Sequence, residues 1–423
     1  MKDQFLAADI AEEILNSHIE EGQKIFLHLD SFQQSEVFSK LSFEKQYQFF
    51  LFLEKNFILV FEEMPSDERN SFYKNLEKEE QVNLLPFLKK HIRQELLEFS
   101  SYPHESAGSI MSTEYTSFNE NTSVTDVLNH LREEGKESKL LIYYIYTTDE
   151  ALTLKGVVSL RDLLFSGTET SLKEIAHHNI VISGVFEDQE SVAKKIEKYD
   201  LLAIPVINTK GQLVGIVSHE DALDIIRSEE KEDLEKFMGI VSTGEETYTS
   251  LSVFEHFQKR FIWIILLAAV GLLASFIVDY YRIFLERHSL LTIFMPLMTA
   301  TGGNTASQVA SVIITSLSLG ELSKLSNLKI FLKEFKIAFL LGSFISFFLL
   351  ISIYLFFKDL FLAKVIAVSI FFQILSSTFL ATAIPLGIYK INKDPAVAAS
   401  PAISTIVDIT GLLIYFWITS LFY

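Results

Sequence analysis

The sequence predicts a multidomain protein in which acidic soluble domains precede an all-α membrane domain. Five apolar runs long enough to span a bilayer lie after residue 258, and a segment within residues 109–227 repeats itself after 59 residues. Charge is divided in the same way, because 47 of the 54 acidic residues but only 24 of the 36 basic residues precede residue 258. The expected order is an all-α superhelical N domain, an α+β tandem repeat, a connecting helix and a five-helix all-α transmembrane domain.

Residues 1–102 form the expected N domain. Leu, Phe and Ile recur there at helical spacing with charged residues between them, which predicts short amphipathic helices. We expect these helices at 9–19, 31–41, 43–56, 66–76 and 81–98. The domain is expected to end at Tyr102-Pro103, because the residue before a proline disfavours the helical conformation.

The repeat predicts two similar modules, residues 103–168 and 169–228. Residues 156–164 read GVVSLRDLL and residues 215–223 read GIVSHEDAL. A strand-like run precedes each copy, at 140–146 and 202–207, and a loop, a strand and a helix come earlier in each module. Strand–helix–strand–strand–helix twice over resembles a tandem pair of CBS modules, a regulatory fold. That resemblance implies a site for an adenine nucleotide such as ATP, with Asp162 and Asp221 either contacting a ribose or only capping helices.

Residues 229–258 predict an acidic connecting helix that is interrupted near 239–244. Its acidic side chains follow those of the second module, and Asp221, Asp224 and Glu232 share one helical face. The segment is either a solvated connector or a set of mutually repelling carboxylates that divalent cations bridge. Bridging would compact the soluble half and pull on the helix that enters the membrane.

The membrane domain begins at residue 259, and its apolar runs are 261–278, 289–320, 337–357, 365–389 and 395–423, which are uncharged except for Asp408 in the last. Eight Lys and Arg residues flank these runs on one side of the membrane and four on the other. This bias predicts cytoplasmic N-terminal domains and a C-terminus outside. No signal peptide is expected in residues 1–10, which carry three charges. Five spans favour a homodimer, because ten helices close a pore more readily.

The second run contains a polar segment, residues 296–308, which read PLMTATGGNTASQ. Proline and paired glycines weaken a helix, and polar groups at membrane depth need protein or water around them. The segment therefore predicts either tight helix packing through small residues or a broken or kinked helix that lines a hydrated route.

Asp408 is the only charge in the last run, with thirteen uncharged residues before it and fifteen after it. A carboxylate at that depth costs roughly 2.5–3.5 kcal/mol. It is either a hydrogen-bonded packing contact or part of a cation path, and Ser404 and Gly411 share its helical face. The spans contain no His or Cys, so the ligands are oxygen atoms, which suit Mg2+, Ca2+ or Mn2+. Sparse carboxylates favour Mg2+, which keeps much of its water.

Composition excludes several classes of function. There is no Cys for a disulfide framework or a thiolate metal site, and the acidic surface disfavours nucleic acid and anionic lipid. No nucleophile–base set, P-loop or HExxH motif is present, so we expect no enzyme. The remaining hypotheses are a Mg2+ channel in the inner membrane, a proton- or ion-coupled divalent cation transporter, and a membrane sensor that transports nothing.

These features together resemble the MgtE family of magnesium channels over the whole chain. The motifs are TGGNT at 301–305 with Gln308, and DPA at 394–396 followed by Pro401 and DITGLLIY at 408–415. The resemblance implies that Asp408 holds hydrated Mg2+ in the pore of a homodimer, with Gly303, Asn304 and Thr305 lining the route. It also implies regulatory Mg2+ at eight acids that close the channel when cytosolic Mg2+ is plentiful: Asp188, Glu190, Asp200, Asp221, Asp224, Glu229, Glu232 and Asp233. The chain departs from the family at Ala306-Ser307, where Gly-Asn is frequent, and its N domain does not identify further regulatory acids.

Overall fold

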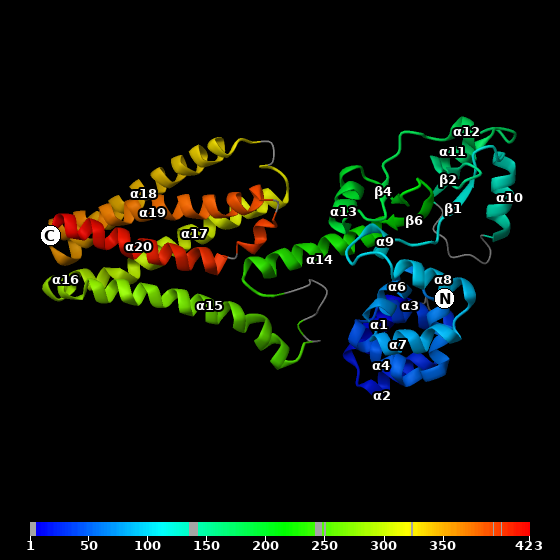
Figure 1. Ribbon diagram of the computed structural model, residues 1–423, viewed down its shortest axis with the longest axis horizontal. Helices are drawn as coiled ribbons and strands as arrows, with labels where there is room; N and C mark the ends of the chain where they lie inside the picture. Colours follow the sequence, from blue (N-terminus) through cyan, green and yellow to red (C-terminus); the bar gives the residue numbers. More distant parts are fainter. Residues whose placement is uncertain are drawn as a thin grey trace. The chain divides into compact units, whose positions relative to one another are not determined.

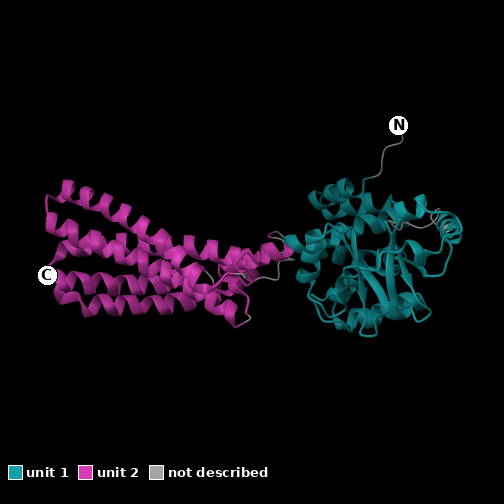
Figure 2. Ribbon diagram, turned by 90° about the horizontal axis from the view of Figure 1, so that it is seen from above, with its two compact units in different colours: residues 1–227 teal, residues 228–423 magenta. Residues whose placement is uncertain are grey.

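The computed structural model describes residues 6–134, 143–241, 248, 251–322, 325–391, 393–398 and 400–423. The chain divides into two compact units, residues 1–227 and residues 228–423 (Figure 2). The first unit contains the N domain and the tandem repeat, and the second contains the end of the connecting helix and the membrane helices (Figure 1).

The N domain is all-α, as predicted. Its helices are α1 (Ala7–Asn16), α2 (Ile19–Leu27), α3 (Ser31–Ser39), α4 (Phe43–Leu53), α5 (Phe57–Glu63), α6 (Ser66–Asn75), α7 (Lys78–Leu84) and α8 (Lys90–Phe99). Aromatic rings fill its core: Phe72 lies 5.3 Å from Phe38 and 5.4 Å from Phe57, measured between ring centroids. Burial of these rings stabilises a domain made of helices too short to be stable alone.

The predicted helix at 81–98 is wrong. The chain leaves α7 at Leu84, passes through the 3-10 turn η2 (Leu85–Phe87) and enters α8 at Lys90. Pro86 explains the break, because proline lacks the backbone N–H that a continuous helix needs. The helices α2 and α5 were not predicted.

The two modules of the repeat have the same topology. The first contains β1 (Thr116–Asn119), α10 (Val124–Glu134), β2 (Tyr144–Thr148), β3 (Leu154–Ser159) and α11 (Leu160–Phe165). The second contains α12 (Leu172–Ile175), β4 (Ser183–Gly184), α13 (Gln189–Lys198), β5 (Ala203–Ile207), β6 (Leu213–Ser218) and α14 (His219–Phe237). Each sheet pairs its first strand parallel and its last strand antiparallel to the middle one.

Strand register shows the repeat at the level of single residues. Ile145 pairs with Val158 in the first sheet, and Ile204 pairs with Val217 in the second. Both partners move by the 59 residues that separate the sequence copies. A short helix, α9 (Ala107–Ile110), precedes the first module, and Ser66 Oγ of the N domain accepts a hydrogen bond from Thr113 N at 2.9 Å. The repeat predicted from sequence is thus confirmed in fold and register.

α14 runs without interruption from the second module into the acidic connector. It ends at Phe237, and Gly239 adopts a φ of 72°, which glycine tolerates and other residues rarely do. The predicted interruption near 239–244 begins at this turn, and residues 242–247 lie outside the described part. The next helix starts at a capping box formed by Ser252 and Glu255.

The second unit is an all-α membrane domain. Its elements are α15 (Val253–Tyr280), α16 (Arg282–Arg287), η3 (Ser289–Phe294), α17 (Met295–Ser318), α18 (Asn327–Phe357), α19 (Leu360–Lys390), η4 (Pro395–Val397) and α20 (Ser400–Phe422). Of the described helices, α15, α18, α19 and α20 are long and apolar enough to cross a membrane. The fifth long helix, α17, has 24 residues and carries the polar segment.

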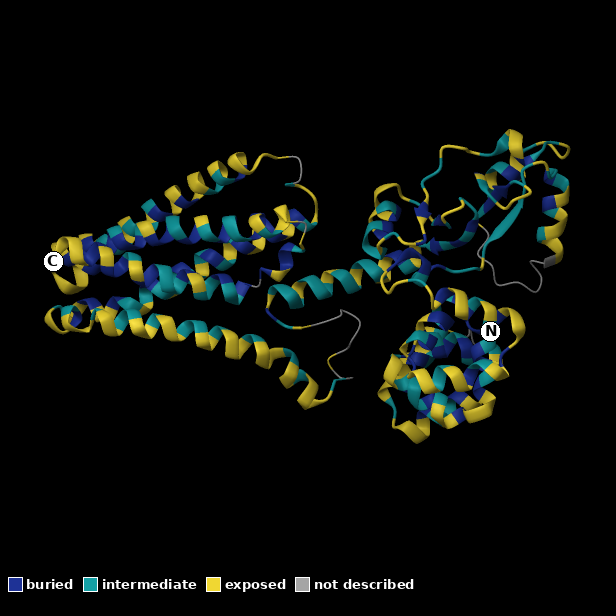
Figure 3. Ribbon diagram, in the orientation of Figure 1, coloured by how far each residue is buried: buried dark blue, intermediate teal, exposed yellow. Residues whose placement is uncertain are grey.

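The membrane helices differ in how far their residues are buried (Figure 3). α19 lies at the centre, and 56% of the residues in its apolar 18-residue stretch are buried. In the corresponding stretch of α15 no residue is buried. α15 contacts α20 near its end, where the rings of Tyr281 and Phe416 stack at 4.5 Å. Between residues 261 and 278 the exposed large side chains of α15 are apolar, as lipid contact requires.

The long second run is divided, but not at its glycines. η3 ends at Phe294 and α17 continues as one helix through Gly302 and Gly303. A break at the glycines is therefore wrong, and packing against α19 and α20 compensates for their low helix propensity. Pro296 sits in the first turn of α17, where its missing N–H has no partner to lose.

Candidate functional site

Asp408 lies on the side of α20 that faces α17. Its Oδ1 atom is 3.5 Å from the position that a Cβ atom on Gly303 would take, and the Ser404 Cβ is 4.0 Å from the same point. The Asp408 side chain is half-buried, and no described residue pairs with it by a hydrogen bond or a salt bridge. A carboxylate placed over a bare stretch of backbone leaves room for a cation with part of its water shell.

Three hydroxyl groups extend this face along the two helices. Ser307 Oγ lies 3.1 Å from Ser404 Oγ, and Ser400 Oγ donates to Ser307 Oγ at 3.1 Å. Ser307 follows Gly303 by one helical turn, as Ser404 precedes Asp408 by one turn. Ser307 was not among the predicted site residues, although its i+4 spacing from Gly303 could have identified it.

The predicted lining residues of α17 do not share one face. Gly303 faces Asp408, whereas Asn304 is exposed on the neighbouring side of the helix. Thr305 Oγ1 donates to the Thr301 carbonyl of its own helix at 2.8 Å. Gly411, predicted to share the Asp408 face, is buried against α19 instead, because three residues of helix rotate it by about 60° from Asp408.

The end of α14 contacts the same helices. Lys236 Nζ lies 3.0 Å from Glu232 of its own helix and 3.4 Å from Asp394, which caps η4. Burial lowers the pKa of Lys236, but the two carboxylates outweigh it and the net shift is upward. Phe237 packs on an apolar cluster that includes Ala306 and Val407. The last turn of α14 thus contacts residues next in sequence to Ser307 and Asp408.

A second acidic group lies within the first unit. Asp67 and Glu68 occupy the first turn of α6 in the N domain, and the Asp221 carboxylate raises the pKa of both. Burial is the largest cause, and it brings the pKa of Asp67 to about 8 and that of Glu68 to about 7. Neither residue was predicted, because only the folded first unit brings them to Asp221.

The other predicted regulatory acids have local partners. Asp188 caps α13 and accepts from Glu190 N at 3.0 Å, while Glu190 pairs with Lys194 at 2.6 Å. Asp200 adopts a φ of 50° in the turn after α13. Asp221 accepts from Ser218 N at 3.1 Å, and in the equivalent helix Asp162 accepts from the hydroxyl of the N-cap residue Ser159 at 2.6 Å. These positions are consistent with capping, one of the two roles considered for Asp162 and Asp221.

The remaining acids lie at the unit boundary and on the connector. Asp224 pairs with Arg227 at 3.4 Å, and Glu229 and Asp233 both take part in polar or electrostatic contacts. Among the described residues, no three His, Cys, Asp or Glu side chains are close enough to hold one metal ion.

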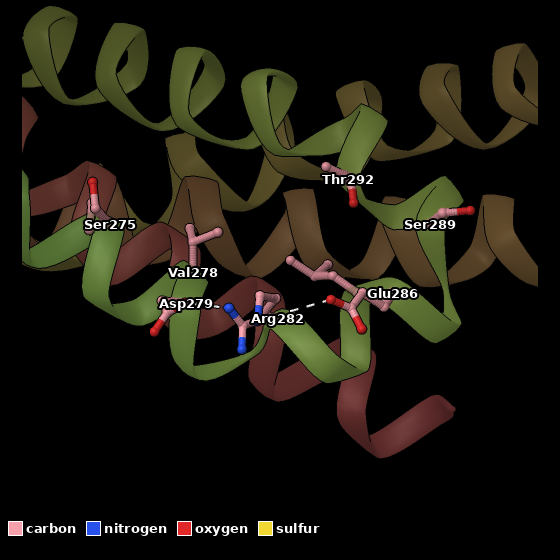
Figure 4. Close-up of a pocket in the computed structure, with 9 residues that line it drawn as sticks. Ser275, Val278, Asp279, Arg282, Glu286, Ser289 and Thr292 are labelled. Atoms are coloured by element: carbon pink, nitrogen blue, oxygen red, sulfur yellow. Dashed lines mark ion pairs between the residues drawn. The ribbon is translucent and has the colours of Figure 1, made fainter.

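A separate cavity of about 650 Å3 lies at the other end of the membrane domain (Figure 4). It is lined by the end of α15, by α16 and by η3. Arg282 lies 3.7 Å from Asp279 and 4.0 Å from Glu286 there. All three side chains are exposed, so these ion pairs contribute little stability. Asp408 and the serine cluster do not line this cavity.

Comparison with known proteins assigns each part of the chain. A family model described as divalent cation transporter matches residues 295–418, the model of the MgtE intracellular N domain matches residues 6–105, and the CBS domain model matches residues 107–167 and 172–228. The magnesium transporter MgtE of Thermus thermophilus is 33% identical over 332 residues, which cover 78% of this chain and 73% of that protein. The magnesium transporter MgtE of Bacillus subtilis is 33% identical, covering 76% and 70%.

A solved structure is similar in fold as well. The crystal structure of the cytosolic domain of the Mg2+ channel MgtE in complex with ATP is 31% identical, with a TM-score of 0.50. The match covers 53% of this chain and 91% of that one. The relatives are named as transporters, in agreement with the prediction that the chain is not an enzyme.

Proposed function

The chain belongs to the MgtE family of divalent cation transporters, and on that premise we propose that it is a Mg2+-selective channel of the cell's inner membrane. It imports Mg2+ down its electrochemical gradient, with the N-terminal domains cytoplasmic and the C-terminus outside. An inside-negative potential contributes about 2.3 kcal/mol per charge per 100 mV, and so about twice that for Mg2+.

The observation that carries this proposal is the place of Asp408. Its carboxylate lies over Gly303 of α17, without a pairing partner among the described residues and beside the Ser307–Ser404–Ser400 cluster. In this proposal Asp408 attracts the partly hydrated ion, and the hydroxyl groups accept and donate hydrogen bonds to its water. Asn304 lies on an exposed side of α17, where a second copy in a homodimer would complete the route.

Closure depends on cytosolic Mg2+ in this proposal. The regulatory positions are those implied by the family resemblance: Asp188, Glu190, Asp200, Asp221, Asp224, Glu229, Glu232 and Asp233. Asp67 and Glu68 join this set, because burial and the nearby Asp221 carboxylate raise the cost of ionising both of them. A bound cation removes that cost and favours the compact state through tighter binding to it.

Movement reaches the pore through α14. Its last turn holds Asp394 through Lys236 and places Phe237 on the Ala306–Val407 cluster. Release of cations from the acids loosens the soluble domains, and α14 then shifts against α17 and α20. ATP at the tandem modules is a further proposed ligand, supported by the relative whose cytosolic domain was solved with ATP.

Ion flux in proteoliposomes tests the proposal. Mg2+ influx that follows the membrane potential and falls as Mg2+ on the cytoplasmic side rises supports a gated channel. Flux that requires a proton gradient indicates a coupled transporter, and no flux of any divalent ion indicates a sensor. Either result replaces the channel proposal.

A further inference from the structure

The central membrane helix α19 contains a line of buried polar residues, and its own backbone accepts hydrogen bonds from three of them. Ser369, Ser377 and Thr382 donate to the carbonyls of Val365, Gln373 and Thr378, four residues earlier, at 2.7–2.9 Å. These hydroxyls therefore need nothing from other helices. Gln373 is different, because its longer amide extends beyond α19.

Gln373 is fully buried, with a relative exposure of 0%. Its Nε2 donates a long hydrogen bond of 3.4 Å to the Val407 carbonyl of α20. Its Oε1 finds no hydrogen-bond donor among the described residues. A buried amide with an unsatisfied oxygen is costly in a membrane domain, so its presence needs a reason other than stability.

The reason lies in the two glycines that the amide touches. A Cβ atom on Gly302 of α17 would overlap the Gln373 Nε2, and one on Gly411 of α20 would overlap the same amide. For Gly411 the three nearest atoms all belong to Gln373, and its Cδ and Oε1 would lie at 2.7 Å. The amide thus fills the space between the two helices, and both glycines are required by its bulk.

The contacts of Gln373 are next in sequence to the proposed site. Gly302 precedes Gly303, and Val407 precedes Asp408, so the amide supports both sides of the site from behind. We propose that Gln373 is a positioning residue that sets the separation of α17 and α20, and with it the ion preference at Asp408. This inference rests on the proposed function, since it assigns a role within the same site.

We expect the volume of the side chain at residue 373 to determine the ratio of Mg2+ to Ca2+ flux. Gln373→Met keeps the length of the side chain and removes the unsatisfied oxygen, so it should melt no lower than the wild type and retain its ratio of Mg2+ to Ca2+ flux. Gln373→Ala leaves a space into which α17 and α20 relax, so it should change that ratio severalfold while still folding.

A suppressor experiment on the full-length protein tests the steric argument. Gly411→Ala should lower the melting temperature in detergent and reduce Mg2+ flux roughly tenfold or more, because the methyl group overlaps Gln373. The double variant Gly411→Ala with Gln373→Ala should recover both. Gly387→Ala is the matched control, since nothing lies within 4 Å of its added Cβ and neither quantity should change.

The outcomes separate the two proposals. A double variant no more stable than Gly411→Ala, or a Gln373→Met protein with the altered ratio of Gln373→Ala, would overturn the positioning role. Recovery of the melting temperature does not depend on transport. If it occurs in a protein that conducts no ions, the packing of Gln373 stands while the proposed function and the ion-preference role both fail.

Discussion

Replacing Asp67 with Asn should stabilise the first unit when no divalent cation is present. Asp67 is half-buried beside Asp221, and its pKa is about 8 in the folded protein against an ordinary value of 3.8. A raised carboxyl pKa means that the folded state holds the proton more tightly than the unfolded state. Stability from this group is therefore fully present below pH 4 and is lost as the pH rises to about 8. Asparagine resembles the protonated form and avoids this loss.

The magnitude follows from the same shift. Each pH unit between the two pKa values is worth about 1.4 kcal/mol, so the gain at pH 7 has an upper bound on the order of 4 kcal/mol. At pH 5 the bound falls to about 1.5 kcal/mol. A cation narrows this difference at pH 7, because binding at 100 times its dissociation constant stabilises the wild type by about 2.7 kcal/mol. The substituted protein should lose most of this cation-dependent gain.

Pulse proteolysis over a urea series, applied to the full-length protein in detergent, measures these differences on fragments from residues 1–227. The exposed Asp9 provides a control, and Asp9→Asn should change stability by less than about 0.5 kcal/mol at any pH. The reasoning is refuted if Asp67→Asn destabilises the unit at pH 7 without divalent ions, or if its effect is the same at pH 5 and pH 8.

Other predictions concern the core and the path between α14 and the site. Phe72→Ala should cost about 3–5 kcal/mol of N-domain stability by urea denaturation, since Phe72 is 1% exposed and its ring contacts several others; a cost under about 1 kcal/mol would contradict the packing. Glu95→Gln should cost about 3 kcal/mol of unfolding free energy, because Arg69, nearly buried and 2.7 Å away, loses its counter-charge. Glu190→Gln should cost about 0.5 kcal/mol or less, because the ion pair of Glu190 with Lys194 lies at the surface. Lys236→Met should weaken the inhibition of flux by cytoplasmic-side Mg2+, because the link to Asp394 is lost; an unchanged inhibition curve would separate α14 from the gate.

Local sequence signals predicted much of this fold. The 59-residue offset carried through to strand pairing, because the strands of both copies bury equivalent residues, such as Ile145 and Ile204. Long uncharged runs identified the membrane helices for a similar reason, since lipid requires such runs. Pro86 could have corrected the helix expected at 81–98, and the i+4 relation of Gly303 to Ser307 could have added the serine cluster.

Other features depend on contacts that no single segment encodes. Asp67 and Asp221 are far apart in sequence, and only the docking of α6 near the second module places them together. Gly411 matched the Asp408 face by spacing, yet it faces Gln373 because α19 packs beside α20. The glycine pair of α17 is weak in isolation and forms a continuous helix because its neighbours fit closely around it.

Mg2+ influx through Asp408→Asn in proteoliposomes tests the central claim most directly. The substitution keeps the size of the side chain and removes the charge that faces Gly303. We expect influx to fall at least about tenfold with the melting temperature unchanged or higher, because a buried charge has been removed. Asp279, an exposed acid near the C-terminal end of α15, provides the control, and the Asp279→Asn protein should conduct as the wild type does. Wild-type influx through the Asp408→Asn protein would contradict the account.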